Sequence, residues 1–191
     1  MRILFVLLGI ATLLLLVWGY KFSRLGLESP SYQVVQQDGE FEIREYPSMV
    51  VVSTSMKSSM PNDGSFMRLF RYISGSNETG QKIAMTTPVL MTQDGEASQM
   101  SFVVPKEVAD TGAPEADGEQ VEIETIAAGK FAAYRYSGDQ NRKAFQQAIT
   151  RLESWLREND RIAIDTPIAA SYDPPFTPAM LKRNEVLVRI Q

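Results

Sequence analysis

Four glutamates are the residues best suited to do chemistry in this sequence. Glu42 and Glu45 lie in the stretch EFEIREY, and Glu122 and Glu124 lie in the similar stretch VEIET. A pair of carboxylates can act as general acid and base, or can hold a cationic ligand, if both groups enter one interior. These positions suggest a site for hydrolysis or for binding a small cation.

Strand geometry favours a different role for these acids. Successive side chains of a strand point to opposite faces. The stretch EFEIREY thus separates into two sets, one with Phe41, Ile43 and Glu45 and the other with Glu42, Arg44 and Tyr46. Charged side chains are seldom buried without a partner, so we expect the acids to be exposed surface charges.

The composition excludes several kinds of site. The 191 residues include no histidine and no cysteine, so an imidazole base, a Ser-His-Asp triad, a thiolate metal site and a disulfide are impossible. A nucleophile elbow, a phosphate-binding loop and a dinucleotide-binding motif are also missing from the sequence. The net charge of −4 argues against a nucleic acid partner.

Two Asp-Gly pairs mark predicted hairpins in the first half of the chain. Asp38-Gly39 and Asp94-Gly95 each separate two strand-like stretches, as in a tight β-hairpin. Between them, apolar residues at helical spacing predict a helix that Asn62 or Asp63 caps and Gly75 ends. These apolar residues are Phe66, Leu69, Phe70 and Ile73.

The second half repeats this order of elements. Residues 105–120 are rich in acidic residues, Gly, Pro and Ala, which predicts a solvated linker. After further strands, a helix is predicted from about Gln140 to Glu158, with Asp139 as its cap. Its apolar stripe consists of Phe145, Ala148, Ile149, Leu152, Trp155 and Leu156.

A repeated phrase indicates that the two halves are duplicates. Residues 83–89 are IAMTTPV and residues 162–168 are IAIDTPI. The pair Glu42-Ile43 likewise corresponds to Glu122-Ile123. Self-similarity of this kind is typical of a duplicated structural unit.

The duplication predicts the fold class. Each half contains strands, one helix and more strands, so its sheet keeps one uncovered apolar face that the other half can cover. We expect an α+β fold whose halves form a pseudo-twofold distorted β-barrel flanked by two helices. Ile83-Ala84 and Ile162-Ala163 would lie in equivalent central strands, each ended by Thr-Pro.

The N-terminal residues predict a transmembrane helix before this domain. From Ile3 to Trp18 the sequence is uncharged and almost entirely apolar, and Trp18 and Tyr20 suit the membrane interface. A cleaved signal peptide is the alternative, although Val17-Trp18-Gly19 is a poor cleavage site. The short leading segment predicts a cytoplasmic amino terminus, which places the soluble part outside a bacterial cytoplasmic membrane.

Domain boundaries follow from these features. Residues 1–22 are the expected membrane anchor or signal segment, and residues 23–31 are a polar tether. Residues 32–191 are the expected folded domain, with halves at 32–104 and 119–191.

Several motifs of this domain resemble those of the SOUL heme-binding protein family. They occur in order from about Tyr32 to the C-terminus and are EFEIREYP, FMRLFRYISGSN, KIAMTTPV, the VP of SFVVP, YSG and YDPPFTPAMLKRNEV. The combination of YDPP with RNEV at this spacing is highly specific. The resemblance implies a duplicated barrel with two helices, which agrees with the repeat.

The resemblance also implies that heme or a related tetrapyrrole binds in a shallow apolar groove between the first helix and the loop before the last strand. A porphyrin needs a flat apolar slot and cations for its propionates. Judged from the residues alone, Phe176 and Met180 could equally well cover one end of the barrel and contact no ligand. The implied binding residues are Met67, Arg68, Arg71, Tyr72, Phe176, Met180, Leu181, Lys182 and Arg183.

The missing histidine limits how iron could be held. Some members of the family were proposed to use a histidine ligand, so iron here would be held by Met60, Met67 or Tyr72, or by no protein group. The resemblance and the apolar N-terminal run together predict a membrane-tethered, non-enzymatic protein that buffers or transfers heme or another tetrapyrrole. The alternative is a GyrI-like effector-binding or hydrolase-like domain for a small molecule inside the barrel.

Overall fold

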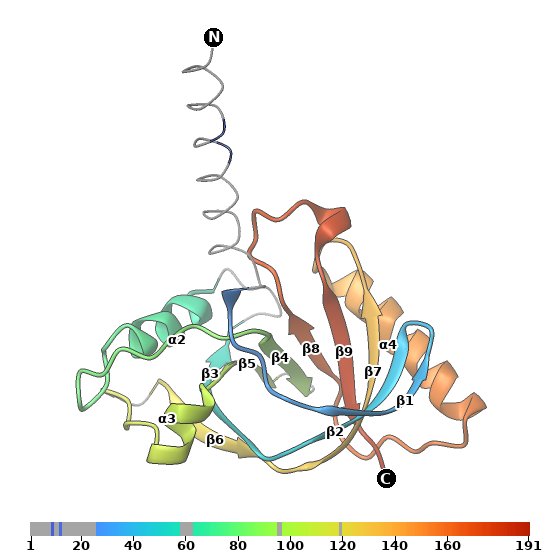
Figure 1. Cartoon of the computed structure of the whole chain (residues 1–191), viewed down its shortest axis with the longest axis horizontal. Helices are drawn as coiled ribbons and strands as arrows, with labels where there is room; N and C mark the ends of the chain where they lie inside the picture. The colour runs from blue at the N-terminus through green and yellow to red at the C-terminus, as the bar shows by residue number, and fades with distance from the viewer. Residues whose placement is uncertain (1–8, 10–11, 13–25, 58–62, 95–96, 119) are drawn as a thin grey trace.

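The protein is shown in Figure 1 as a computed structural model, which describes residues 9, 12, 26–57, 63–94, 97–118 and 120–191. The predicted membrane segment falls almost entirely outside these residues. Within them, no helix combines the length and the apolar character needed to span a bilayer. The described part comprises most of the predicted folded domain together with residues 26–31, which precede it.

Nine strands form one antiparallel sheet in the described part of the chain. They are β1 (Gln33–Asp38), β2 (Phe41–Tyr46), β3 (Met49–Met56), β4 (Val89–Asp94), β5 (Ala97–Val103), β6 (Glu122–Ile126), β7 (Gly129–Tyr136), β8 (Ile168–Ser171) and β9 (Asn184–Arg189). Across the sheet their order is β1-β2-β7-β9-β8-β4-β5-β3-β6. Both predicted hairpins are confirmed, β1 with β2 and β4 with β5.

The strand order confirms the duplication. Apart from β1, every strand of one half has a counterpart in the other half. The counterparts are β2 and β6, β3 and β7, β4 and β8, and β5 and β9. Exchanging all counterparts reverses the strand order and keeps every pairing. The centre of this symmetry is the β4–β8 pair, where Leu90 lies opposite Ala170. Each half contributes one strand to the other half's sheet, because β2 pairs with β7 and β6 pairs with β3. The exchange joins both halves into one folding unit.

The repeated phrases lie before the central strands, so the prediction that they form those strands is wrong. Pro88 and Pro167 directly precede β4 and β8, which means that Thr-Pro introduces each strand and does not end it. Proline has no N–H to donate, so the position before a strand suits it. The two phrases also differ in burial, since Ile83 is 6% exposed and Ile162 is 60% exposed.

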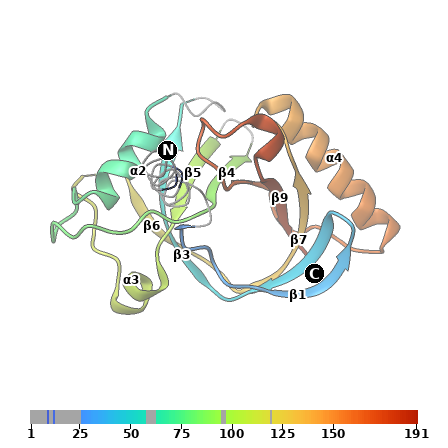
Figure 2. The same cartoon turned by 45° about the horizontal axis from the view of Figure 1, so that its top comes forward.

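The sheet curls strongly but does not close into the predicted barrel. Figure 2 shows it bent around a concave side. β1 and β6 stand at the two ends of the strand order, without a further strand partner among the described residues. β1 has no counterpart in the second half, and its sequence QVVQQD is mostly exposed. Polar side chains along an edge strand discourage pairing with another strand.

Two helices cover the convex side of the sheet at opposite ends (Figure 2). α2 (Ser65–Ile73) packs on β3 and β5, and α4 (Arg142–Glu158) packs on β7 and β9. At α2 the N-cap is Gly64 and not the predicted Asp63, although Asp63 Oδ1 accepts a hydrogen bond from the N–H of Ser65 at 3.0 Å. The other predicted cap, Asn62, lies outside the described residues. At α4 the cap is Asn141 and not the predicted Asp139, since Asn141 Oδ1 accepts from the N–H of Ala144 at 2.9 Å.

The predicted linker contains a third helix, α3 (Lys106–Thr111). Its composition gave no helical signal, and the helix is too short to be stable alone. Val108 and Ala109 pack against the apolar cluster beneath α2. Tertiary packing therefore stabilises a helix that local sequence does not predict.

Alternation along the strands separates a convex core from a concave one. On β7, Ala132 faces α4 and packs near Leu152, whereas Phe131 and Ala133 face the concave side together with Leu187. The helices cover the convex core. An interior site can therefore form only on the concave side.

Candidate functional site

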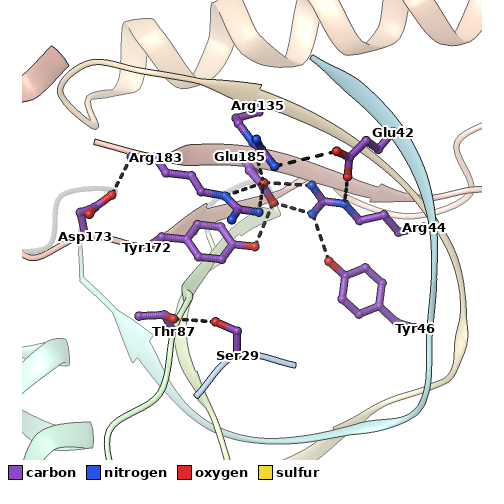
Figure 3. A network of polar contacts seen from close by, with 10 residues as sticks. All are labelled: Ser29, Glu42, Arg44, Tyr46, Thr87, Arg135, Tyr172, Asp173, Arg183 and Glu185. Carbon is purple, nitrogen blue, oxygen red and sulfur yellow. Dashed lines mark hydrogen bonds and ion pairs between the residues drawn. The ribbon is translucent and has the colours of Figure 1, made fainter. Parts of the chain in front are cut away.

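A layer of buried and half-buried charged side chains crosses the concave side of the sheet (Figure 3). Its members, which we call the charged layer, are Glu42, Arg44, Arg135, Arg183 and Glu185. Glu185 has no exposed surface, and Arg44 is 1% exposed. Arg44 reaches both carboxylate oxygens of Glu185, with Nη1–Oε2 at 2.6 Å and Nη2–Oε1 at 2.9 Å. Three guanidinium groups thus lie beside two carboxylates, and Asp173 adds a third carboxylate at the edge, where its Oδ2 accepts from the N–H of Arg183 at 2.6 Å.

Arg183 and Tyr172 complete the surroundings of the Glu185 carboxylate. Arg183 donates to Oε1 from Nε at 2.9 Å and from Nη2 at 2.7 Å, and the Tyr172 hydroxyl donates to Oε2 at 2.9 Å. The guanidinium of Arg183 also stacks 4.1 Å from the centre of the Tyr172 ring. A buried carboxylate requires such donors because its loss of hydration is otherwise very costly.

The protonation states of this site follow from burial and charge. Burial alone would raise the pKa of Glu185, but hydrogen bonds and charges from Arg44 and Arg183 outweigh burial and lower that pKa to about 2. Burial raises the pKa of Tyr46 to about 12, and burial with the nearby Glu185 charge raises the pKa of Tyr172 further. At neutral pH the carboxylate is charged and both phenols are neutral.

The prediction that the strand acids are exposed is wrong for Glu42. This residue is 8% exposed, and its Oε2 accepts a hydrogen bond from Arg44 Nε at 2.6 Å. Glu45, Glu122 and Glu124 are exposed as predicted. The predicted division of EFEIREY into two faces is confirmed. The face with Glu42 and Arg44 is the concave one, and Glu42 can be buried there because Arg44 compensates its carboxylate.

Glu185 and Arg135 are functional candidates that the sequence patterns do not single out. Alternation in NEVLVR places Glu185 on the same face as Leu187, and this inward position is the signal that could have identified it. Its partners come from elsewhere, since β9 pairs with β7, where Arg135 lies directly opposite Glu185. Long-range pairing of this kind leaves no local pattern in the sequence.

A small cavity, here called the inner cavity, adjoins the charged layer and has a volume of about 100 Å³. Its wall is mostly apolar and aromatic, with Tyr46, Leu90, Phe131 and Leu187 among the lining residues. Arg183 is the one charged side chain among the described residues that line it. The cavity therefore combines apolar walls with a single cation.

The four candidates from the first helix lie on α2 but differ in availability. Met67 and Arg71 are exposed. Arg68 is already bound to β3, because its Nε donates to Thr54 Oγ1 at 3.0 Å. Tyr72 is buried with its hydroxyl donating to the carbonyl oxygen of Pro114 at 2.7 Å, and burial raises its pKa to about 12.

A second hollow lies beside α2 and has a volume of about 450 Å³. We call it the outer hollow. Arg68, Arg71 and Tyr72 line it on the helix side, and Ala116 and Val121 belong to its opposite side. The structure thus brings three of the four helix candidates to one surface depression.

The five loop candidates have two different environments. Phe176, Met180 and Leu181 are 72%, 82% and 62% exposed, with the last two in a short 3-10 helix. Lys182 pairs with Asp139 through a 2.8 Å contact, and Arg183 belongs to the charged layer.

The contacts of the two segments do not place them on one surface. The loop contacts the connection between β7 and α4, where the N–H of Gly138 donates to the carbonyl oxygen of Ala179 at 3.0 Å. α2 packs on β3 and β5. A groove between helix and loop therefore stays a prediction, and the candidate ligand Met60 lies outside the described residues.

Fold and site together define a class of duplicated α+β domain with a polar layer on its concave side. The crystal structure of the EcmrR C-terminal domain has this fold, with a TM-score of 0.59, 14% identity, and coverage of 84% of this chain and 98% of that chain. At this identity the similarity concerns the fold alone.

The sequence narrows this class to one family. Residues 27–189 match the profile of the SOUL heme-binding protein family, so the chain belongs to that family and the resemblance is confirmed. Heme-binding protein 1 of Xenopus tropicalis is 28% identical over 163 residues, which is 79% of this chain and 84% of that protein. Heme-binding protein 2 of Homo sapiens is 30% identical over 182 residues, or 86% of either chain.

Proposed function

We propose that this domain binds heme or a related tetrapyrrole on its outer surface, in the outer hollow beside α2. The observation that carries this proposal is the combination of family membership with a hollow of about 450 Å³ lined by Arg68 and Arg71. Pockets for drug-sized ligands span roughly 300–1,000 Å³, so the inner cavity is too small for a macrocycle.

The side chains around the outer hollow fit the porphyrin better than its iron. Arg71 is exposed and makes no ion pair with the described residues, so its guanidinium is available to a propionate. The apolar lining of the hollow includes Ala116 and Val121, and Met67 and Phe70 are exposed on the same helix outside the lining residues. Tyr72 is committed to Pro114, so Met67 is the candidate ligand that remains on α2. We propose that affinity rests mainly on apolar contact and propionate pairing.

We further propose that the protein acts without catalysis, tethered to the membrane, and buffers or transfers its ligand outside the bacterial cytoplasmic membrane. The apolar run from Ile3 to Trp18 supports the tether, and the names of the relatives describe binding. Protease added to intact spheroplasts should digest the domain without any disruption of the membrane. Protection of the domain in intact spheroplasts would reverse the orientation.

Hemin titration of the full chain in detergent tests the proposed site. We expect a saturable, one-to-one change of the Soret band, measured against the same micelles without protein. Arg71→Ala should weaken binding roughly tenfold, because one charge-assisted pair with a propionate is lost.

The matched control is Lys143→Ala, which removes an exposed cation from α4. Its affinity for hemin should equal that of the unchanged protein. A Soret band that does not respond in the unchanged protein would contradict tetrapyrrole binding. Equal weakening by both substitutions would place the ligand elsewhere.

A further inference from the structure

We propose that the inner cavity is a second binding site, which takes a short-chain monocarboxylate with its carboxylate beside Arg183 and its alkyl chain against the apolar wall. This site is separate from the outer hollow, and the proposal does not rest on tetrapyrrole binding. Its support comes from the size, the charge and the closure of the cavity.

The size of the inner cavity restricts its ligand to a few carbon atoms. Its volume is about 100 Å³. A cavity of roughly 150 Å³ lined by apolar side chains holds benzene, so about six non-hydrogen atoms, as in butyrate, are the upper limit here. The apolar wall, with Leu90, Phe131 and Leu187, suits an alkyl chain rather than a fully polar solute.

The charge of the site favours an anionic head group. No Asp or Glu is found among the described residues that line the cavity, and Arg183 is the cation on its wall. Behind Arg183 lies the charged layer, in which Arg183 and Arg44 share the Glu185 carboxylate. Glu185 is already surrounded by Arg44, Arg135 and Arg183, so it offers little to an incoming cation. The Arg183 guanidinium on the wall attracts an anion in the cavity and repels a cation.

The hydroxyl of Tyr46 adds a donor at this end of the cavity. It accepts a hydrogen bond from Arg44 Nη1 at 3.2 Å, and its own proton has no hydrogen-bond acceptor among the described residues. Figure 3 shows the Tyr46 and Tyr172 hydroxyls directed toward the charged layer. A carboxylate beside Arg183 could therefore accept a second hydrogen bond from Tyr46.

Residues 28–30, here called the strap, close one side of the cavity. Ser29 and Pro30 are part of its lining. The Glu28 carbonyl oxygen accepts from the N–H of Thr87 at 2.8 Å, and Ser29 Oγ lies 2.8 Å from Thr87 Oγ1 (Figure 3). Glu28 Oε1 also accepts from the N–H of Lys106 at 3.0 Å. Lifting the strap would break these bonds and open a path to the cavity.

Three ligands with four carbon atoms each and different head groups test the proposal. The full chain in detergent is melted with increasing butyrate, n-butylammonium or 1-butanol at constant ionic strength. We expect butyrate to raise the Tm in a saturable way. The other two should leave the Tm unchanged at the same concentrations, because they lack the negative charge that Arg183 binds.

Two phenylalanine substitutions on β6 locate the effect. Ile126 lines the inner cavity, while Ile123 on the other face of the strand packs beneath α2. Ile126→Phe should fill the cavity and reduce the butyrate affinity at least tenfold, whereas Ile123→Phe should keep it. If Ile126→Phe does not fold, NMR on the unchanged protein replaces this comparison of variants. It should show contacts between butyrate protons and the Leu187 methyl groups.

Each remaining outcome overturns the proposal. A Tm that does not respond to butyrate shows that the cavity holds water or nothing. An equal response to all three ligands shows no recognition of the carboxylate. Full butyrate binding in Ile126→Phe, or NMR contacts that avoid Leu187, places the ligand elsewhere. None of these results affects hemin binding at the outer hollow, which is measured separately.

Discussion

Replacing Arg44 with methionine should lower the free energy of unfolding by roughly 3–5 kcal/mol, because it leaves buried carboxylates without their principal cation. Arg44 donates to Glu42 at 2.6 Å and to both oxygens of Glu185. Methionine retains much of the side-chain length but none of the donors. Urea denaturation of the full chain, followed by tryptophan fluorescence, measures the loss.

Two further variants decide whether the loss comes from the uncompensated charge. Glu45→Gln changes the exposed neighbour on the same strand and should alter stability by no more than about 0.5 kcal/mol. The double variant with Arg44→Met and Glu185→Met should be more stable than the sum of the single losses predicts, since it removes charges of both signs. Simple additivity of the two losses would show that Arg44 and Glu185 do not stabilise each other.

Acid should destabilise the protein through Glu185. The charges and hydrogen bonds of Arg44 and Arg183 outweigh burial and hold the pKa of Glu185 at about 2, below its ordinary value of 4.5. A lowered pKa stabilises the fold above the ordinary value, and this stabilisation is lost as the pH falls through the folded value. The difference corresponds to about 3 kcal/mol, which should disappear between about pH 5 and pH 2.

Urea denaturation at a series of pH values measures this effect, with Glu185→Gln as the reference. Glutamine cannot titrate, so the variant should be less stable at neutral pH but should lose about 3 kcal/mol less on acidification. The difference between the two pH profiles isolates this one group from the other acids. Parallel profiles would mean that Glu185 is not the group whose protonation destabilises the fold.

The contrast between Glu42 and the outer acids shows where sequence patterns suffice. Alternation in EFEIREY correctly separates Ile43 from Glu42 and Arg44, because the period of a strand depends only on local backbone geometry. Which of the two faces is buried depends on what covers it. Arg44 and Glu185 lie far apart in the chain, and only the pairing of β2 with β7 and of β7 with β9 brings them together.

The sequence by itself determined the duplication, the two Asp-Gly hairpins, the stripe of α4 and the family, because each depends on local spacing or on an ordered set of motifs. It also excluded imidazole chemistry, since the chain contains no histidine. The tertiary structure decided that the sheet stays open, that the repeated phrases precede their strands and that Arg183 faces an interior cavity. These properties arise from contacts between distant segments, whose energies depend on the burial and charge that the complete fold creates.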